Sequence, residues 1–312
     1  MKSVFVFPGQ ASQYVGMGRE LSEAFPLAAA VFDEAFSVLG EDFKRIVWEG
    51  PVEELNLTEN TQPGVLAASI AAWRVLKERV PAMEPAFLAG HSLGEYSALV
   101  AAGSISLADA LKTVRERGRL MQKAVPVGVG AMAALMGMEF DDVKAVCEDT
   151  RGGRVCIPAN DNAPGQVVIA GHADAVERAV EKAKAVGCRR AVMLPVSAPF
   201  HCSLMEPARR GLEPVLEKVE FADLRWPVVA NVDARPVITG AEARARLEAQ
   251  VDSPVRWRET MLYLKEQGIE AVVEVGPGSV LRGLAKRVSR EWKLINVENV
   301  ETLEKAVTEL CG

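Results

Sequence analysis

The chain has 312 residues, of which 49% are hydrophobic and 25% are charged, a composition typical of a globular protein with one large or two modest domains. Its formal net charge of −6 at pH 7 argues against a nucleic-acid-binding protein, which would need a basic surface. The five cysteines contain no CxxC pair, so we expect neither a disulfide framework nor a structural zinc site, and this usage indicates a reducing compartment.

The first apolar run, at 3–7, predicts a buried strand that ends at Pro8-Gly9. It is too short for the core of a signal peptide, and no uncharged stretch reaches the roughly 20 apolar residues of a membrane-spanning helix. We therefore expect a cytoplasmic protein that does not bind a membrane.

Further buried strands are predicted along the chain at 86–90, 226–231 and 272–276. Helical patterns lie between the strands, at 63–79, 93–102, 106–123, 203–218, 241–250, 257–267 and 278–290. Because buried strands alternate with helices, the sequence predicts an α/β fold in which helices flank both faces of a mostly parallel sheet.

From residue 130 the rhythm changes to strand, helix, strand, strand, helix, strand, which is the order of a ferredoxin-like βαββαβ unit. The predicted strands are at 131–138, 155–160, 166–171 and 189–196, and the predicted helices are at 141–150 and 173–187. Glycines before this segment and prolines after it are suited to hinges. We therefore predict an inserted ferredoxin-like subdomain at 127–197, within a discontinuous large α/β domain formed by 1–126 and 198–312.

The segment GHSLG at 90–94 fits the pattern G-x-S-x-G between a predicted strand and a predicted helix. In hydrolase-like α/β cores the two glycines of this pattern let strand and helix pack closely, and the serine, here Ser92, is exposed at the bend. The N-terminus of the helix then offers free backbone N–H groups to a developing oxyanion. This context favours a nucleophile, and the alternative is that Ser92 is a plain helix N-cap without chemistry.

A serine nucleophile needs a base, and the chain has three histidines. His91 adjoins Ser92, and side chains at successive positions usually diverge. His172 follows a predicted strand and is interpreted as a turn residue. His201 is the candidate by elimination, with a purely structural histidine as the alternative.

The group that would orient His201 is not evident. Hydrolases usually place the orienting acid before the histidine in the sequence. The candidates in this chain all come after it: Asp223, Asp233 and Asp252. A backbone carbonyl could orient the ring instead, and a sequence does not display such a contact.

The helix predicted at 106–123 carries Arg115 and Arg117 at the two edges of its apolar face. An arginine that leans into a core must find an anion, because an unpaired buried charge is very costly. That anion could be a structural carboxylate or the carboxylate of a ligand, held by two hydrogen bonds. Helical periodicity does not choose between the two arginines, and either could be an ordinary solvated residue.

Taken together, these segments resemble one family, the malonyl-CoA:acyl-carrier-protein transacylases. The similar segments run in order along nearly the whole chain: FVFPGQASQ at 5–13, TQPGVLAAS at 61–69, GHSLGEYSALVAAG at 90–103, RGRLMQKAVPVGVGAMAALMG at 117–137, NAPGQVVIAGH at 162–172, SAPFHCSLM at 197–205, QVDSPVRW at 250–257 and VEVGPGSVL at 273–281. Each is weak alone, but chance does not arrange all of them in this order. The resemblance implies ping-pong transfer of a malonyl group from malonyl-CoA to acyl carrier protein in fatty-acid synthesis, without a cofactor or a metal.

The resemblance also implies roles for individual residues. Ser92 matches the family's nucleophile and His201 its general base. Arg117 matches the arginine that binds the malonyl carboxylate. The backbone N–H groups of Gln10 and Leu93 match the two donors of the oxyanion hole.

Further positions match the family's pattern less directly. Gln250 matches the residue whose main-chain carbonyl orients the histidine in place of an acid. Phe200 resembles the bulky residue of malonyl-selective acyltransferases, which favours malonyl over methylmalonyl. Because acyl carrier proteins are acidic, we predict that the carrier docks at Lys286 and Arg287, with a merely solvated helix face as the alternative.

Other functions remain open at this point. A serine hydrolase or thioesterase would share Ser92 and His201 but would not need a carboxylate-binding arginine. A non-catalytic carrier-protein binding module would form no acyl-enzyme, and an acyltransferase of a polyketide assembly line would differ only in its partner. Cys202, beside His201, is interpreted as a small packing residue. The sequence carries no signal of oligomeric state, and a monomer is our expectation.

Overall fold

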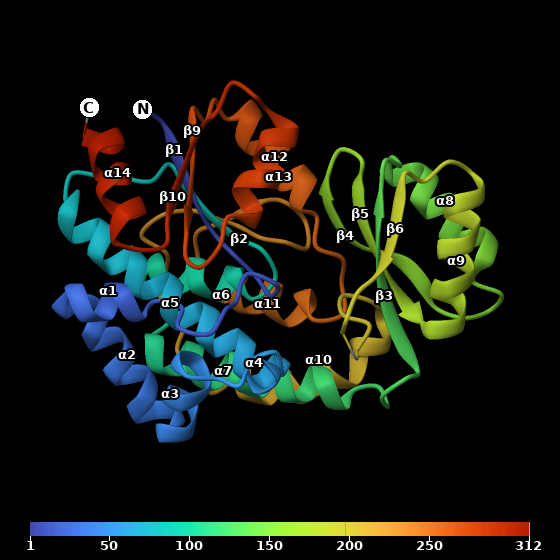
Figure 1. The fold of residues 1–312 in the computed structure, drawn as a ribbon, viewed down its shortest axis with the longest axis horizontal. Coiled ribbons are helices and arrows are strands. Elements are labelled where there is room, and N and C mark those ends of the chain that lie inside the picture. The colour runs from blue at the N-terminus through green and yellow to red at the C-terminus, as the bar shows by residue number, and fades with distance from the viewer. Residues whose placement is uncertain (197, 312) are drawn as a thin grey trace.

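Two β-sheets of different size lie side by side in the computed structural model, which describes residues 1–196 and 198–311 (Figure 1). The chain builds most of the larger body, passes through the smaller sheet between α7 and α10, and then returns to complete the larger body. Ser197 and Gly312, at which the two predicted domains end, lie outside the described residues. Within the described residues, no helix is both long and apolar enough to cross a membrane.

The larger sheet has six strands and is parallel except at one edge. Its strands, in spatial order, are β10 (Lys293–Val297), β9 (Ala271–Val275), β1 (Ser3–Phe7), β2 (Phe87–Gly90), β7 (Val228–Val229) and β8 (Pro236–Val237). Only β7 and β8 pair antiparallel. The predicted mostly parallel sheet is thus confirmed. The strand expected at 226–231 is shorter than predicted, and β8 and β10 were not predicted.

Alternate residues of β1 face two different cores, because successive side chains of a strand point to opposite faces. Phe5 and Phe7 share a core with α1 (Arg19–Ala24), α2 (Pro26–Leu39), α3 (Glu41–Trp48), α4 (Val52–Leu55), α5 (Thr58–Arg79), α6 (Gly94–Ala101), α7 (Leu107–Lys123), α10 (Glu206–Leu216), α11 (Gly240–Gln250) and α14 (Val300–Cys311). Val4 and Val6 pack against α12 (Trp257–Glu266) and α13 (Val280–Val288) on the other face. Helices therefore cover both faces, as predicted. The helices α1 to α4 and α14 were not predicted, and α5 begins five residues earlier than expected.

The smaller sheet is antiparallel and has the strand order β4-β5-β3-β6. Its strands are β3 (Gly130–Met136), β4 (Cys156–Ala163), β5 (Gln166–His172) and β6 (Arg190–Met193). The helices α8 (Phe140–Thr150) and α9 (Ala173–Ala185) pack on one face and share an apolar core with it. In Figure 1 these two helices lie on the far side of the sheet from the larger body.

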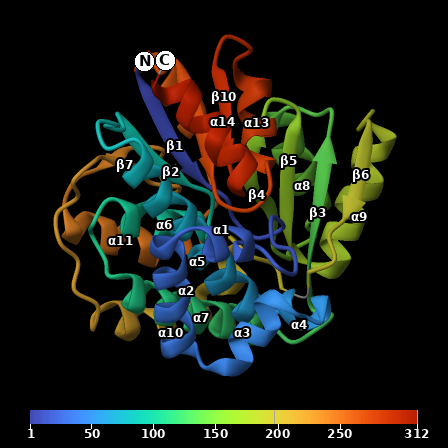
Figure 2. The same ribbon diagram turned by 60° about the vertical axis from the view of Figure 1, so that its left-hand side comes forward.

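The strand β4 joins the smaller sheet to the larger body. The amide of Val255 donates to the carbonyl of Ala159 at 2.8 Å, and the amide of Asp161 donates to the carbonyl of Val255 at 3.0 Å. Arg258 of α12 pairs with the Asp161 carboxylate at 2.8 Å. The register of β4 shifts on both sides of this segment, an irregularity of the kind that redirects side chains next to functional sites. Figure 2 shows β4 beside α13, so the smaller sheet meets the larger body along this line.

Candidate active site

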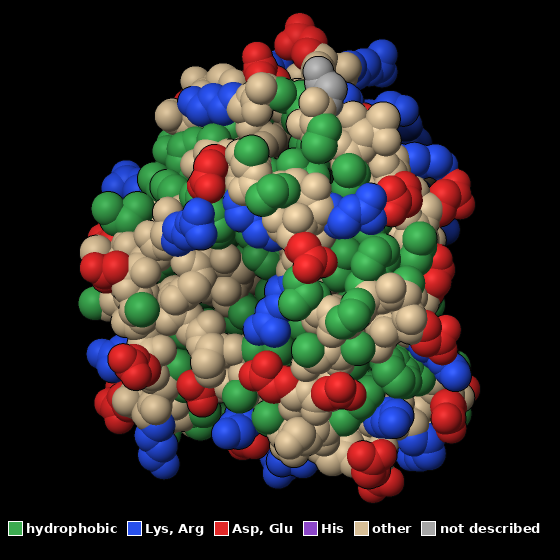
Figure 3. All heavy atoms as spheres, turned by 90° about the vertical axis from the view of Figure 1, so that its left-hand side faces the viewer, with side chains coloured by type: hydrophobic (Ala, Val, Ile, Leu, Met, Phe, Trp, Pro, Cys, Tyr) green, Lys and Arg blue, Asp and Glu red, His purple; other side chains and the backbone are tan. Residues whose placement is uncertain are grey.

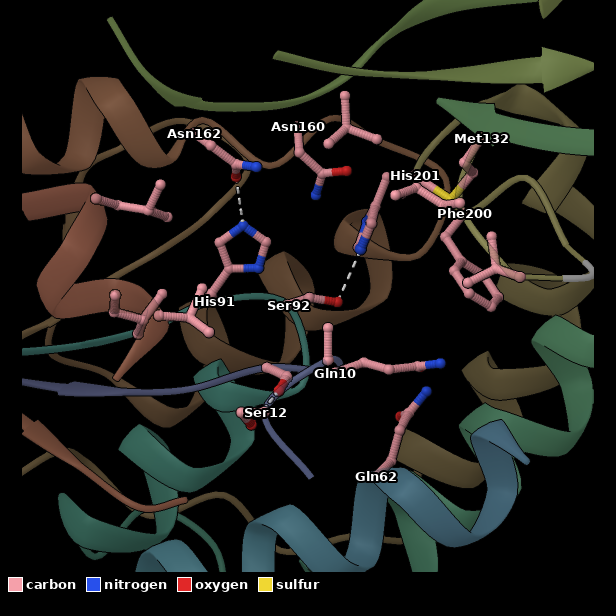
Figure 4. Close-up of a pocket in the computed structure, with 18 of the residues that line it drawn as sticks. Gln10, Ser12, Gln62, His91, Ser92, Met132, Asn160, Asn162, Phe200 and His201 are labelled. Atoms are coloured by element: carbon pink, nitrogen blue, oxygen red, sulfur yellow. Dashed lines mark hydrogen bonds between the residues drawn. The ribbon is translucent and has the colours of Figure 1, made fainter. Parts of the chain in front are cut away.

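Ser92 lies on the turn between β2 and α6 with a φ of 52°, a left-handed conformation that costs roughly 1–3 kcal/mol for a residue other than glycine. Close packing enforces this turn. A Cβ on Gly90 would lie 1.9 Å from the carbonyl carbon of Gly94, and a Cβ on Gly94 would lie 2.1 Å from the carbonyl oxygen of Phe7. The strand and the helix can approach only because both positions are glycine, and the side chain of Ser92 is directed into a pocket (Figure 4).

His201 faces this serine, with Nε2 2.7 Å from Ser92 Oγ (Figure 4). The other ring nitrogen, Nδ1, lies 3.0 Å from the main-chain oxygen of Gln250. Because a carbonyl only accepts hydrogen bonds, Nδ1 carries the ring proton and Nε2 is left to accept from the serine hydroxyl. Burial, aided by the charge of Arg117, lowers the pKa of His201 to about 3. The imidazole is therefore neutral at pH 7 and can take the hydroxyl proton.

Arg117, on α7, is buried against the same serine. Its Nη2 donates to Ser92 Oγ at 3.1 Å and to Gln250 Oε1 at 2.9 Å, and its Nη1 donates to Gln62 Oε1 at 2.7 Å. The next residue, Gly118, lets α7 approach α5, since a Cβ there would lie 2.7 Å from the Thr58 carbonyl oxygen. Burial lowers the pKa of Arg117. Among the described residues its hydrogen-bond partners are uncharged, and the Glu95 carboxylate acts on it without a direct hydrogen bond.

The second arginine that the sequence left open lies elsewhere. Arg115 donates to the carbonyl of Leu39 at 2.9 Å and lies over the ring of Phe43. It therefore faces the loop after α2, and it is Arg117 that reaches the pocket.

Two backbone amides of the site, those of Gln10 and Leu93, come from the loop after β1 and from the start of α6. Gln10 follows β1 and lines the pocket, and Leu93 follows Ser92 at the start of α6. Neither amide donates a hydrogen bond to another residue in the described ranges. Gly9 brings the Gln10 loop against the serine turn, because a Cβ at that position would lie 2.6 Å from the carbonyl oxygen of His91. The two amides therefore have no hydrogen-bond acceptor among the described residues.

The pocket is a cavity of about 220 Å³ between the two sheets. The larger body contributes the catalytic candidates, and the smaller sheet contributes a wall of mixed polar and apolar side chains. The strands supply Met132, Asn160, Asn162, Gln166 and Val168, and the segment after β6 adds Leu194 and Val196. Phe200, 9% exposed, lines the pocket beside His201 (Figure 4). The reacting hydroxyl of Ser92 and the ring of His201 thus face a cavity that both parts of the molecule line.

Sequence reasoning missed several polar residues of the site. His91 was expected to diverge from Ser92, yet it also lines the pocket, where its Nε2 lies 2.8 Å from Asn162 Oδ1 (Figure 4). Burial lowers the pKa of His91. Gln62, which holds Arg117, lies within the TQPG segment, whose similarity to the family was the one available signal. Asn231 gave no signal at all.

Other residues considered from the sequence lie away from the reacting atoms. The three aspartates bind elsewhere, Asp223 to the amide of Gly240, Asp233 to Arg246 and Asp252 to Arg209. His172 accepts from the amide of Val155 and is the last residue of β5, so its interpretation as a turn residue was wrong. Cys202 is fully buried, and burial raises its pKa to about 12, so it has no reactive thiolate.

Lys286 and Arg287 do not line the pocket. Both are exposed on the last turn of α13, whose first turns supply the pocket residues Val280, Leu281 and Leu284. In the part of the chain that the structure describes, no group of three or more His, Cys, Asp or Glu side chains is placed to hold a metal ion.

A serine on a strand-to-helix turn that hydrogen-bonds to a neutral histidine beside free backbone amides has the geometry of a serine-dependent acyl-transfer enzyme. The sequence comparisons identify the same class. Residues 4–308 match the family described as the acyl transferase domain, and the chain belongs to that family.

Individual relatives are similar over nearly their whole length. The malonyl CoA-acyl carrier protein transacylase of Salmonella typhimurium is 49% identical over 305 residues, which cover 98% of both chains. An acyl carrier protein S-malonyltransferase from Vibrio cholerae has a similar crystal structure, with a TM-score of 0.95, 47% identity, and coverage of 98% of this chain and 100% of that one. A malonyl-transacylase solved with a type II polyketide acyl-carrier protein gives a TM-score of 0.96 at 45% identity, with coverage of 99% and 100%. The resemblance read from the sequence motifs is therefore confirmed.

Proposed function

We propose that this chain transfers the malonyl group from malonyl-CoA to the phosphopantetheine thiol of acyl carrier protein, as a step of fatty-acid synthesis. The observation that carries the proposal is Arg117, a cation with 1% exposure that lies 3.1 Å from Ser92 Oγ and contacts only uncharged acceptors among the described residues. Such a guanidinium is suited to a ligand carboxylate, which it can hold through two parallel hydrogen bonds. A malonyl group carries that carboxylate, and the named activity of the relatives supports the same substrate.

In the first half of the reaction, Ser92 Oγ attacks the thioester carbonyl of malonyl-CoA while His201 Nε2 takes the hydroxyl proton. The carbonyl oxygen becomes an oxyanion, which the amides of Gln10 and Leu93 hold; one such donor is typically worth about 3 kcal/mol. The tetrahedral intermediate then expels the CoA sulfur, which takes the proton from His201. The product is malonyl-Ser92, with the carbonyl of Gln250 holding the histidine ring throughout.

In the second half, the phosphopantetheine thiol gives its proton to His201 and attacks the malonyl-serine ester. The same two amides hold the oxyanion, and the serine oxygen leaves with the proton returned by His201. Both acyl transfers are thus one mechanism run in opposite directions, which defines a ping-pong enzyme. Because serine, histidine and backbone amides supply every chemical role, the proposed reaction needs neither a cofactor nor a metal.

We further propose that residues 127–197 form an inserted ferredoxin-like subdomain, and that 1–126 with 198–312 form the large domain. The strand order β4-β5-β3-β6 and a separate apolar core with α8 and α9 support this division. Its role is to close the pocket from the side opposite Ser92. Excluding water there protects the malonyl ester from hydrolysis and favours the thiol as acceptor.

The direct test is the intact mass of the protein after incubation with malonyl-CoA. We expect one malonyl group per chain, bound to the peptide that contains Ser92. Addition of phosphopantetheinylated acyl carrier protein should remove the group from the enzyme and move it to the carrier. Release of free malonate at the same rate without carrier would identify a thioesterase instead, and absence of any label would identify a binding module.

The carrier docking site is proposed on α13, beside the pocket mouth. Reversal of both charges, Lys286→Glu with Arg287→Glu, should raise the KM for the acidic carrier about tenfold and leave the rate of acylation by malonyl-CoA unchanged. The matched control is Lys144→Glu with Lys184→Glu, on the exposed sides of α8 and α9, which changes net charge equally. Figure 3 shows cationic and anionic side chains intermixed on the face that lies at the left of Figure 1. Equal KM values in the two double variants would refute docking at α13.

Phe200 is proposed to limit the acyl group to malonyl. Its ring lines the pocket beside His201, where a substituent on the α-carbon of the acyl group would need space. In Phe200→Ser the ratio of kcat/KM for methylmalonyl-CoA to kcat/KM for malonyl-CoA should rise about tenfold. Space for one methyl group in a pocket typically gives a discrimination of this size. Acylation rates with both thioesters measure this ratio, and an unchanged ratio would remove Phe200 from the selectivity determinants.

The acting unit is proposed to be a monomer in a reducing compartment such as the cytoplasm. The five cysteines are free thiols, which supports the reducing compartment.

A further inference from the structure

A buried carboxylate lies directly behind the serine turn, and the mechanism above gives it no role. Glu95, in the first turn of α6, is 2% exposed. It accepts from the backbone amide of Asn231 at 3.0 Å and from Gln250 Nε2 at 2.8 Å. Burying a carboxylate is costly even with such partners, so a neutral side chain would serve mere packing better.

The side chain of Asn231 spans the turn that carries the nucleophile. Asn231 is fully buried, its Oδ1 accepts from the backbone amide of Ser92 at 2.7 Å, and its Nδ2 donates to the carbonyl of Gly90 at 2.7 Å. One amide group thus holds both ends of a turn whose φ of 52° at Ser92 is strained. Glu95 holds Asn231 in turn through the backbone amide of that residue.

The side chain of Gln250 is oriented by opposite charges at its two ends. Its Nε2 donates to Glu95 and, at 3.0 Å, to the carbonyl of Ser92, while its Oε1 accepts from Arg117 Nη2 at 2.9 Å. A carboxylate and a carbonyl can only accept, and a guanidinium can only donate, so just one orientation of the amide satisfies all three partners. The main-chain oxygen of this same residue holds His201.

We propose that Glu95 and Asn231 are positioning residues for the acylation of Ser92, an inference that rests on the proposed function. Asn231 fixes the turn on which the nucleophile lies. Glu95 fixes Asn231 and turns the amide oxygen of Gln250 toward Arg117, so that the guanidinium stays where the substrate carboxylate binds. Three buried polar side chains therefore couple the nucleophile, the base and the carboxylate site into one network.

The test is Glu95→Gln, assayed at pH 8, because burial raises the pKa of Glu95 to about 7. The glutamine can still accept from the Asn231 amide and from Gln250 through its one amide oxygen, because both bonds go to the same carboxylate oxygen of Glu95. It removes the negative charge that holds the Nε2 end of Gln250 and acts on Arg117, so the guanidinium is positioned less firmly. We expect acylation by malonyl-CoA to fall about 100-fold and acylation by acetyl-CoA about tenfold, because misplacement of Arg117 affects only the substrate that has a carboxylate. A purely structural loss would lower the two rates by the same factor.

The matched control is Glu274→Gln. Glu274 is equally buried, its pKa is also raised to about 7 by burial, and it binds backbone amides at the start of α13 rather than any residue of the network. Its substitution should leave the ratio of malonyl to acetyl acylation unchanged even if the melting temperature falls. The proposed function has a separate test, which is labelling of the wild-type protein by malonyl-CoA. Absence of that label would refute the proposed function, whereas the inference is judged by the ratio of the two acylation rates in the variants.

Asn231→Ala provides a second arm should Glu95→Gln fail to fold. It removes the acceptor of the Ser92 amide and keeps the backbone amide that binds Glu95. We expect both acylation rates to fall about tenfold in folded protein, as verified by circular dichroism. The proposal is overturned if Glu95→Gln changes neither rate or lowers both equally, or if folded Asn231→Ala acylates at the wild-type rate.

Discussion

Ser92→Ala is expected to abolish the acyl-enzyme and to lower malonyl transfer by about six orders of magnitude, the loss that follows removal of the nucleophile from a serine enzyme. His201 Nε2 lies 2.7 Å from Ser92 Oγ, so the substitution leaves the base without a proton to take. The amides of Gln10 and Leu93 then have no tetrahedral intermediate to hold. Intact mass and peptide mapping after exposure to malonyl-CoA measure the result.

The control for this substitution is Ser97→Ala, one turn further along α6. Ser97 is fully buried, and its hydroxyl has no hydrogen-bond partner among the described residues, so its removal should leave labelling intact. Alanine at position 92 keeps the Cβ and the left-handed turn, and both variants should melt close to the wild-type temperature. Malonylation of Ser92→Ala at another residue would contradict the assignment of the nucleophile.

The serine turn was predictable because its causes are local in sequence. Two glycines flank the serine, an apolar strand precedes them and a helical pattern follows. The structure shows why both positions are glycine, because a Cβ at Gly90 or Gly94 would overlap backbone atoms. The alternation of strands and helices was predictable for the same reason. The helices α1 to α4 and α14 and the edge strands β8 and β10 were missed, and of these α4 and β8 span only four and two residues, too few to show a periodic pattern.

The polar support of the site could not be predicted in this way. The contact between the Ser92 amide and Asn231 joins residues 139 positions apart, and that between Glu95 and Gln250 joins residues 155 positions apart. Only the folded chain brings these side chains together, and no spacing in the sequence encodes them. The two arginines of α7 show the same limit, because periodicity placed both at the edge of an apolar face. The close approach of α7 to α5 at Gly118 decides which of them reaches the pocket.

Arg117→Ala is expected to lower acylation by malonyl-CoA by about 100-fold or more, while acylation by acetyl-CoA changes by no more than about threefold. The malonyl carboxylate would enter a buried site without its cation, and the acetyl group has no carboxylate to lose contact with. The measurement is the single-turnover rate of Ser92 acylation with each thioester. Equal losses for the two substrates would refute a carboxylate-binding role and would indicate that Arg117 only supports the fold.

The same variant makes a second, independent change to the site, because the charge of Arg117 is one cause of the low pKa of His201. Removal of the Arg117 charge raises the pKa of His201. The fall of kcat/KM for acetyl transfer at acidic pH should therefore begin at a higher pH in Arg117→Ala than in the wild type. Burial remains, so the pH at which this fall occurs should stay below the ordinary pKa of histidine.

Arg117→Lys separates the effect of the charge from the effect of the paired donors. It keeps the positive charge, so the acid limb should stay near its wild-type position, but it loses the planar pair of donors, so the preference for malonyl should fall. A shifted limb in the lysine variant would mean that the position of the guanidinium, and not its charge, sets the basicity of His201.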